Sequence, residues 1–250
     1  MDFENVFSQQ PRTEKPYLGA IHSKDQETLD RLTEPRNWDY AQFRSILVAL
    51  AKVSNAQSIT ARNRPNSIHL QGWRKCIDDL VDRSRKSGKE HARVILADTE
   101  KDSLVVSGKI TIGSRDSVRL DVSRQPGREK FQKAIASLHV HPDNLTSHGL
   151  SGQDYKTFLS DSEQQVMMIA YGKANRIMVL KTTVTPNNLD ESAINRHIED
   201  VESEYINNSN KHPVLRVVDF NKSVCSEFGL VMYMADEKSS DLFERVNVTQ

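Results

Sequence analysis

Residues 138–154, LHVHPDNLTSHGLSGQD, gather metal-ligand side chains in a chain that otherwise offers few groups for chemistry. Within them, a single residue separates His139 from His141. Alternate side chains of an extended strand point to the same face. A strand over residues 136–141 would therefore direct both imidazoles to one side and turn Val140 into the core.

An oxygen ligand can return to this histidine pair at the end of the same segment. Ser151 and Asp154 follow the pair, and a turn leading into a helix would bring the Asp154 carboxylate back to the imidazoles. Two imidazoles and one carboxylate leave a fourth position for water, which is the arrangement of catalytic rather than structural zinc. The sequence thus predicts a zinc site formed by His139, His141 and Asp154.

The H-x-H-P sequence followed by S-x-x-D resembles the signature of the JAMM (MPN+) metalloprotease family. In that family two histidines and the aspartate hold zinc, the serine helps to stabilise the tetrahedral intermediate, and an upstream glutamate hydrogen-bonds the zinc-bound water. The resemblance implies that His139, His141 and Asp154 are the ligands. It also implies that Ser151 supplies the oxyanion-side hydroxyl and that Glu90, which opens the run EHARVIL, is the catalytic glutamate.

The resemblance covers roughly residues 85–185 and departs from the family pattern in three respects. Val140 stands between the histidines, where the family usually has Ser or Thr. Nine residues separate His141 from Ser151, where the family usually has seven. The strand after Glu90 lacks the glycine that often follows there. The longer spacer contains His148, which is either an alternative ligand or a loop residue.

Three of these residues also have a purely structural explanation. Ser151 as N-cap and Asp154 three positions later form a variant of the capping box, at the start of a helix that runs through Tyr155. That explanation does not account for the histidine pair or for Pro142 just after it. Glu90 has its own alternative as an ordinary exposed carboxylate at a strand edge.

The global composition favours one sizeable core and no strongly charged partner. A chain of 250 residues is long enough for one large core or for one domain with appendages. Its 34 Lys+Arg balance 34 Asp+Glu, so neither nucleic-acid nor membrane-surface binding is expected. Two distant cysteines, Cys76 and Cys225, suit a reducing compartment. Because no leader and no run of about 18 apolar residues is visible, we expect a soluble, cytoplasmic protein.

Hydrophobic periodicity predicts an α+β fold with a mixed or antiparallel sheet flanked by helices. Residues 1–37 are polar and read as an irregular arm, and residues 38–88 carry two amphipathic helices that would pack on the core. Residues 89–185 would form the catalytic domain, which the resemblance identifies as a cytidine-deaminase-like MPN (JAB) domain. Its predicted strands are an antiparallel meander at 93–97, 103–112 and 117–122, then the histidine strand, then strands at 166–170 and 177–180.

Residues 186–250 are expected to form a small C-terminal α/β extension. Apolar residues recur at helical spacing from Ile194 to Tyr205, and the acidic outer face of this helix is either simply solvated or a contact for a basic substrate. After Pro213 an apolar run at 214–218 predicts a strand, and residues 220–228 predict a short helix. Residues 230–234 predict an edge strand or a separately packed appendage.

Three functional hypotheses follow from this pattern. The first, which the resemblance favours, is a zinc metallopeptidase or isopeptidase, a hydrolase whose protein or peptide substrate includes the C-terminal tail of ubiquitin or a ubiquitin-like protein. The second is a catalytically inactive MPN-like binding or scaffold protein. The third is hydrolysis of a substrate other than a peptide, in a groove reshaped by the nine-residue spacer.

Overall fold

The structure, a computed structural model, describes residues 37–52, 64–71, 73–115, 117–118, 120, 130–142, 149–171, 175–186, 190–207, 210, 212–236 and 241–248. Nearly all of the arm predicted at 1–37, together with His148, lies outside these residues. Both Cys76 and Cys225 are free thiols. Within the described ranges, none of the helices has the length and apolar character needed to cross a bilayer.

The secondary structure is mixed, as the periodicity predicted. The helices of the described part are α3 (Tyr40–Lys52), α4 (Arg74–Ser87), α5 (Gly152–Ser160), α6 (Glu191–Glu202), which continues into a π-helical turn at Ser203–Asn207, and α7 (Pro213–Glu227). The strands are β1 (Asn37–Trp38), β2 (Ser67–His69), β3 (His91–Asp98), β4 (Ser103–Val106), β5 (Thr111–Ile112), β6 (Gln132–Val140), β7 (Val166–Tyr171), β8 (Asn175–Leu180), β9 (Val231–Ala235) and β10 (Leu242–Arg245).

These strands form one sheet in the order β1-β2-β10-β9-β8-β7-β6-β3-β4, with β5 paired to β3. Strand β6 is antiparallel to β3 on one side and parallel to β7 on the other. Parallel neighbours need a crossover connection, and α5 lies in the connection between β6 and β7. The end of β6 therefore lies beside the start of β3, and the chain leaves this point to enter α5.

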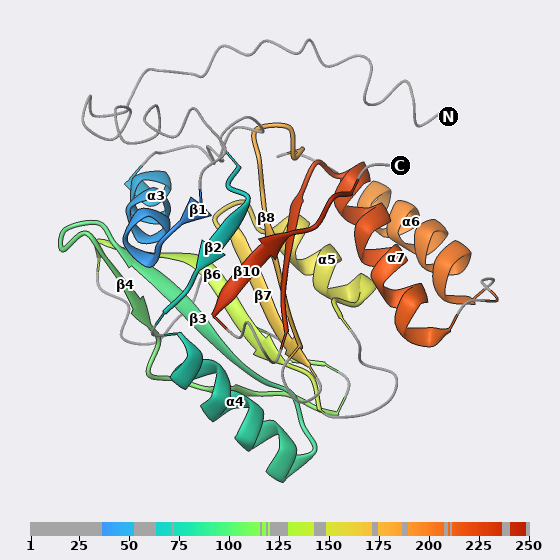
Figure 1. Cartoon of the computed structure of the whole chain (residues 1–250), viewed down its shortest axis with the longest axis horizontal. Helices are drawn as coiled ribbons and strands as arrows, with labels where there is room; N and C mark the ends of the chain where they lie inside the picture. Colours follow the sequence, from blue (N-terminus) through green and yellow to red (C-terminus); the bar gives the residue numbers. More distant parts are fainter. Residues whose placement is uncertain are drawn as a thin grey trace.

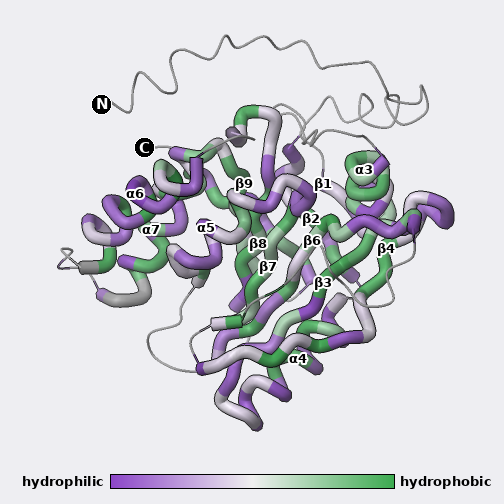
Figure 2. Tube along the Cα trace, turned by 180° about the vertical axis from the view of Figure 1, so that it is seen from behind, coloured by the Kyte–Doolittle hydropathy of each residue, from purple (hydrophilic) through white to green (hydrophobic). Residues whose placement is uncertain are grey.

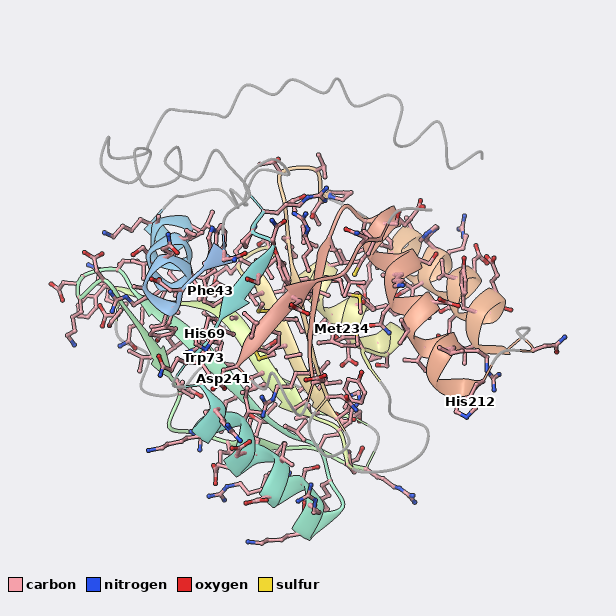
Figure 3. The ribbon with its side chains drawn as sticks, in the orientation of Figure 1. Phe43, His69, Trp73, His212, Met234 and Asp241 are labelled. Atoms are coloured by element: carbon pink, nitrogen blue, oxygen red, sulfur yellow. The ribbon has the colours of Figure 1, made fainter. Side chains whose placement is uncertain are left out.

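Helices cover both faces of the sheet, as Figure 1 shows with α3 and α4 on one side and α5, α6 and α7 on the other. The buried apolar side chains of α3 and α4 share one cluster with one face of the sheet, and those of α5, α6 and α7 share another with the opposite face. In Figure 2 the central strands are predominantly hydrophobic and the helices alternate in hydropathy along their length. In Figure 3, Phe43 of α3 lies close to Trp73, with ring centroids 5.9 Å apart.

The predicted meander is only partly present. Strands β4 and β5 both pair antiparallel with β3, so residues 103–112 form two short strands rather than one. The interruption lies at Ser107, whose hydroxyl donates to the Lys109 carbonyl at 3.0 Å. Such local bonds from side chain to backbone compete with a strand ladder. The strand predicted at 117–122 is absent from residues 117–118 and 120, and its other residues lie outside the described part.

The structure differs from two predictions for the C-terminal residues. Residues 214–218 belong to helix α7 and not to a strand, because a short apolar run fits a buried helix as well as a strand. Pro213 takes the first helical position, where its missing N–H is not needed. Strand β9 lies between β8 and β10, so it is neither an edge strand nor an appendage. Segments 38–88 and 186–250 thus contribute strands to the same sheet as residues 89–185.

Candidate metal centre

The two histidines lie at the carboxyl end of strand β6, with His139 as its penultimate residue and His141 directly after its final residue. His139 is paired with Ala92 of β3 and Ile169 of β7, and the backbone N–H of His141 donates to Ala170 at 3.0 Å. Both imidazoles are buried, and their ring centroids lie 5.1 Å apart. Val140 points to the other face of the sheet and packs in the apolar cluster under α3 and α4. The predicted alternation along this strand is confirmed.

Helix α5 supplies the carboxylate through its first turn. Ser151 is the N-cap, and its hydroxyl oxygen accepts from the Asp154 N–H at 3.2 Å. Asp154 Oδ2 accepts from the Ser151 N–H and from the Ser151 hydroxyl, each at 2.7 Å. The capping box is therefore real. It is also compatible with a ligand role, because it occupies Oδ2 and leaves Oδ1 at 3.2 Å from His139 Nε2.

Glu90 reaches the same place from the start of β3. Because His91 pairs antiparallel with Val140, Glu90 stands opposite His141. Both polar groups of its backbone bond to the segment 113–114: the N–H donates to the Ser114 carbonyl at 2.8 Å and the carbonyl accepts from the Gly113 N–H at 2.9 Å. Glu90 Oε1 lies 3.5 Å from His141 Nε2. With 4% of its surface exposed, Glu90 is not the exposed carboxylate of the alternative explanation.

The three candidate ligands converge on one small volume. One ligand atom each from His139, His141 and Asp154 lies within 4.8 Å of the others. His139 Nε2 is buried and makes no hydrogen bond, although Asp154 Oδ1 is 3.2 Å away, so the contact has the distance of an ion pair without hydrogen-bond direction. A buried nitrogen whose contact lacks hydrogen-bond direction can serve another partner, such as a metal ion. Nitrogen and oxygen donors of this kind fit zinc.

Mutual electrostatics hold the centre largely in the form that binds a cation. Burial and the neighbouring His139 lower the pKa of His141 to about 4. Burial opposes the charge of Asp154, but the two histidines and the Ser151 hydroxyl keep its pKa below the usual range. Burial also disfavours the charge of His139, yet the carboxylates of Asp154 and Glu90 raise its pKa. His141 and Asp154 are therefore in the deprotonated forms that metal ligands need near neutral pH, whereas the raised pKa of His139 favours its protonated form.

One residue that no sequence pattern indicated contacts this centre indirectly. Asn221 of α7 binds the chain on both sides of the Ser151–Asp154 capping box. No local pattern links residue 221 to this turn, since the hydrogen-bonded residues are 66 and 71 positions apart in sequence.

A surface hollow along α5 and α6 is lined by polar side chains and contains none of the candidate ligands.

Comparison with known proteins adds no identity to this picture: no family model and no curated protein matches the chain.

Proposed function

We propose that the chain is a zinc-dependent metallopeptidase or isopeptidase of the JAMM type, with an MPN (JAB)-like core in which His139, His141 and Asp154 hold the ion. The observation that carries the proposal is the convergence of three ligand atoms within 4.8 Å, among which the buried His139 Nε2 makes no hydrogen bond. This donor set leaves one coordination position open, as catalytic zinc requires. The burial of Glu90 beside His141 adds support.

The chemistry proposed is hydrolysis of an amide. When bound, a zinc ion supplies a Lewis acid and lowers the pKa of water toward about 7. Glu90 would accept the proton of the attacking water and return it to the leaving amine. The Ser151 hydroxyl would donate to the developing oxyanion. In the structure that hydroxyl donates to Asp154 Oδ2 at 2.7 Å. It must give up this hydrogen bond before it can donate to the oxyanion of a substrate.

The substrate class rests on the resemblance of the H-x-H-P and S-x-x-D motifs alone. It implies a protein or peptide substrate, including an isopeptide bond to the tail of a ubiquitin-like protein. A panel of ubiquitin-like fusions and small amides would distinguish this class from non-peptide substrates. Cleavage of the amides without any cleavage of the fusions would contradict the isopeptidase assignment.

Elemental analysis of purified protein tests the metal site directly. We expect about one zinc per chain, lost when His139→Ala and His141→Ala are combined. His91→Ala is the matched control, because His91 is an equally buried histidine at the same end of the sheet, pairs with Val140 and lies outside the ligand set. This control should keep its zinc.

Catalysis is tested separately with Glu90→Gln, which should retain zinc and lose hydrolysis by about 100-fold or more. If the wild-type chain takes up no zinc when supplied with it, the enzyme proposal fails. If it binds zinc but Glu90→Gln matches the wild type on every substrate of the panel, the catalytic assignment fails and a scaffold function is favoured.

A further inference from the structure

A single buried amide ties the C-terminal helix α7 to the turn that carries the Asp154 ligand. Asn221 has no exposed surface. Its Nδ2 donates to the Leu150 carbonyl at 3.2 Å and to the Val217 carbonyl at 2.8 Å, and its Oδ1 accepts from the Tyr155 hydroxyl at 2.9 Å. Leu150 directly precedes the capping box and Tyr155 directly follows it. The amide therefore binds the backbone just before the four-residue segment that contains the ligand and the side chain of the residue just after it.

The contact with Leu150 reaches the ligand through one rigid unit. The Leu150 carbonyl and the Ser151 N–H belong to the same planar trans peptide, so fixing one group orients the other. Asn221 holds the carbonyl at 3.2 Å, and the Ser151 N–H donates to Asp154 Oδ2 at 2.7 Å. With Oδ2 so engaged, Oδ1 is the oxygen that lies 3.2 Å from His139 Nε2.

Close packing of two glycines shows how little room this turn has. Gly149 has φ +144°, and a Cβ there would lie 2.9 Å from Val217 Cγ1 and 3.1 Å from Asn221 Nδ2. A Cβ on Gly152 would lie 2.9 Å from both Ile198 and Glu202 of α6. The chain thus enters α5 pressed against α7 and begins its first turn pressed against α6.

We propose that Asn221 is a positioning residue of the metal centre, and that α7 sets the orientation of the Asp154 carboxylate through the Leu150–Ser151 peptide. The inference rests on the proposed zinc site and assigns to the C-terminal segment a part in building it. Partners in the outer shell of a metal site orient its ligands, and their loss typically weakens metal binding by about 10- to 100-fold. Asn221 acts one step further out, through a peptide group rather than through a side chain.

The test compares Asn221→Leu with Cys225→Ala. Leucine has a similar size and no hydrogen-bonding groups. Cys225 is the matched control, because it is also fully buried on α7 and lies 3.5 Å from the Tyr155 hydroxyl. The hydrogen bond to the Leu150 carbonyl comes from Asn221, so Cys225→Ala leaves its donor in place. Zinc affinity is measured by competition with a chelator. Hydrogen exchange of the Ser151 amide is measured in metal-free protein, relative to the Ile169 amide in β7.

We expect Asn221→Leu to weaken zinc binding by about 10-fold or more and to speed Ser151 exchange by a similar factor, with Cys225→Ala changing each by less than about threefold. Equal effects in the two variants, or zinc affinity of Asn221→Leu within threefold of the wild type, would overturn the inference. If Asn221→Leu does not fold, Asn221→Ala must give the expected pattern, because it removes the donor to the Leu150 carbonyl without adding a larger side chain. A wild-type chain without zinc affinity would refute the proposed function, whereas Ser151 exchange would still decide whether Asn221 holds the peptide.

Discussion

Strand β6 sends Leu138 and Val140 to one face of the sheet and Ser137 and His139 to the other, and the two faces are packed differently. Under α3 and α4, the buried side chains form one large apolar cluster. On the opposite face the apolar packing is divided into a large cluster under α5, α6 and α7 and a small one around Leu96. The buried polar groups of the candidate centre lie on this second face.

This difference separates the source of stability from the site of chemistry. An apolar face gains free energy from every side chain that it removes from water. A face with buried imidazoles and carboxylates loses part of that gain unless each polar group is paired or bound to an ion. Substitutions on the α3 and α4 face should therefore change the free energy of unfolding alone. Substitutions on the other face should also change metal binding.

Truncation of Phe43 should give the largest effect on stability. Its ring is fully buried and lies 5.9 Å from that of Trp73. Phe43→Ala should lower the free energy of unfolding by about 3 to 5 kcal/mol, measured by urea denaturation. Leu215→Ala is the control, because Leu215 is 56% exposed on α7 and its loss should change stability by about 0.5 kcal/mol or less. If Phe43→Ala also abolished zinc binding by the folded protein, the two faces would not be independent.

The second effect is a pH dependence of metal-free protein, and it comes from His141. Its pKa falls from an ordinary value of 6.5 to about 4 in the folded chain. Between these two values the unfolded chain binds a proton that the folded chain excludes, so stability decreases as the pH is lowered through this window. At most about 3.5 kcal/mol is lost, since one pKa unit corresponds to about 1.4 kcal/mol.

The other two ligands act in different pH ranges. The raised pKa of His139 contributes stability below 6.5 that is lost as the pH rises through its folded pKa. The lowered pKa of Asp154 contributes stability above its ordinary value that is lost in stronger acid. His141→Asn should therefore flatten the stability profile between pH 6.5 and 4 specifically. The free energy of unfolding is measured by urea titrations at several pH values. If it fell as steeply with decreasing pH in His141→Asn as in the wild type, His141 would not be held neutral.

Local geometry around the candidate centre could be predicted from the sequence because the relevant patterns are short. Alternation along one strand fixed the common direction of His139 and His141, and the S-x-x-D spacing fixed the capping box at Ser151. The position of Glu90 needed family resemblance, because its proximity to His141 depends on the pairing of β3 with β6. Antiparallel pairing of strands separated by over thirty residues leaves no local trace in the sequence.

The parts that were mispredicted depend on packing rather than on pattern. Residues 214–218 have the composition of a strand, but helical spacing places Phe220, Val224 and Phe228 in the cluster under α5, α6 and α7. Residues 230–234 were expected either as an edge strand or as a separately packed appendage, yet β10 follows β9 and pairs with both β9 and β2. The contact of Asn221 with Leu150 could not be predicted for the same reason, since it exists only once α7 has packed beside α5.

The smallest expected change in stability, at Ser151, gives the sharpest comparison. Its hydroxyl caps α5 and donates to the Asp154 carboxylate, so Ser151→Ala should lower the free energy of unfolding by only about 1 kcal/mol. Zinc affinity should nevertheless fall by about 10-fold, because Asp154 Oδ2 loses one of its two Ser151 donors. Phe43→Ala should show the reverse, with a large loss of stability and an unchanged affinity.

Ser151→Thr separates the hydroxyl from the rest of the side chain. Threonine keeps an oxygen that can cap the helix and donate to Asp154, so both stability and zinc affinity should stay close to wild type. Chelator competition on Ser151→Ala and Ser151→Thr, with urea titrations of the same samples, decides the matter. If the two variants bound zinc equally well, the Ser151 hydroxyl would stabilise the helix without orienting the carboxylate. The Ser151 N–H, which Asn221 holds through the Leu150–Ser151 peptide, would then account for the position of Asp154.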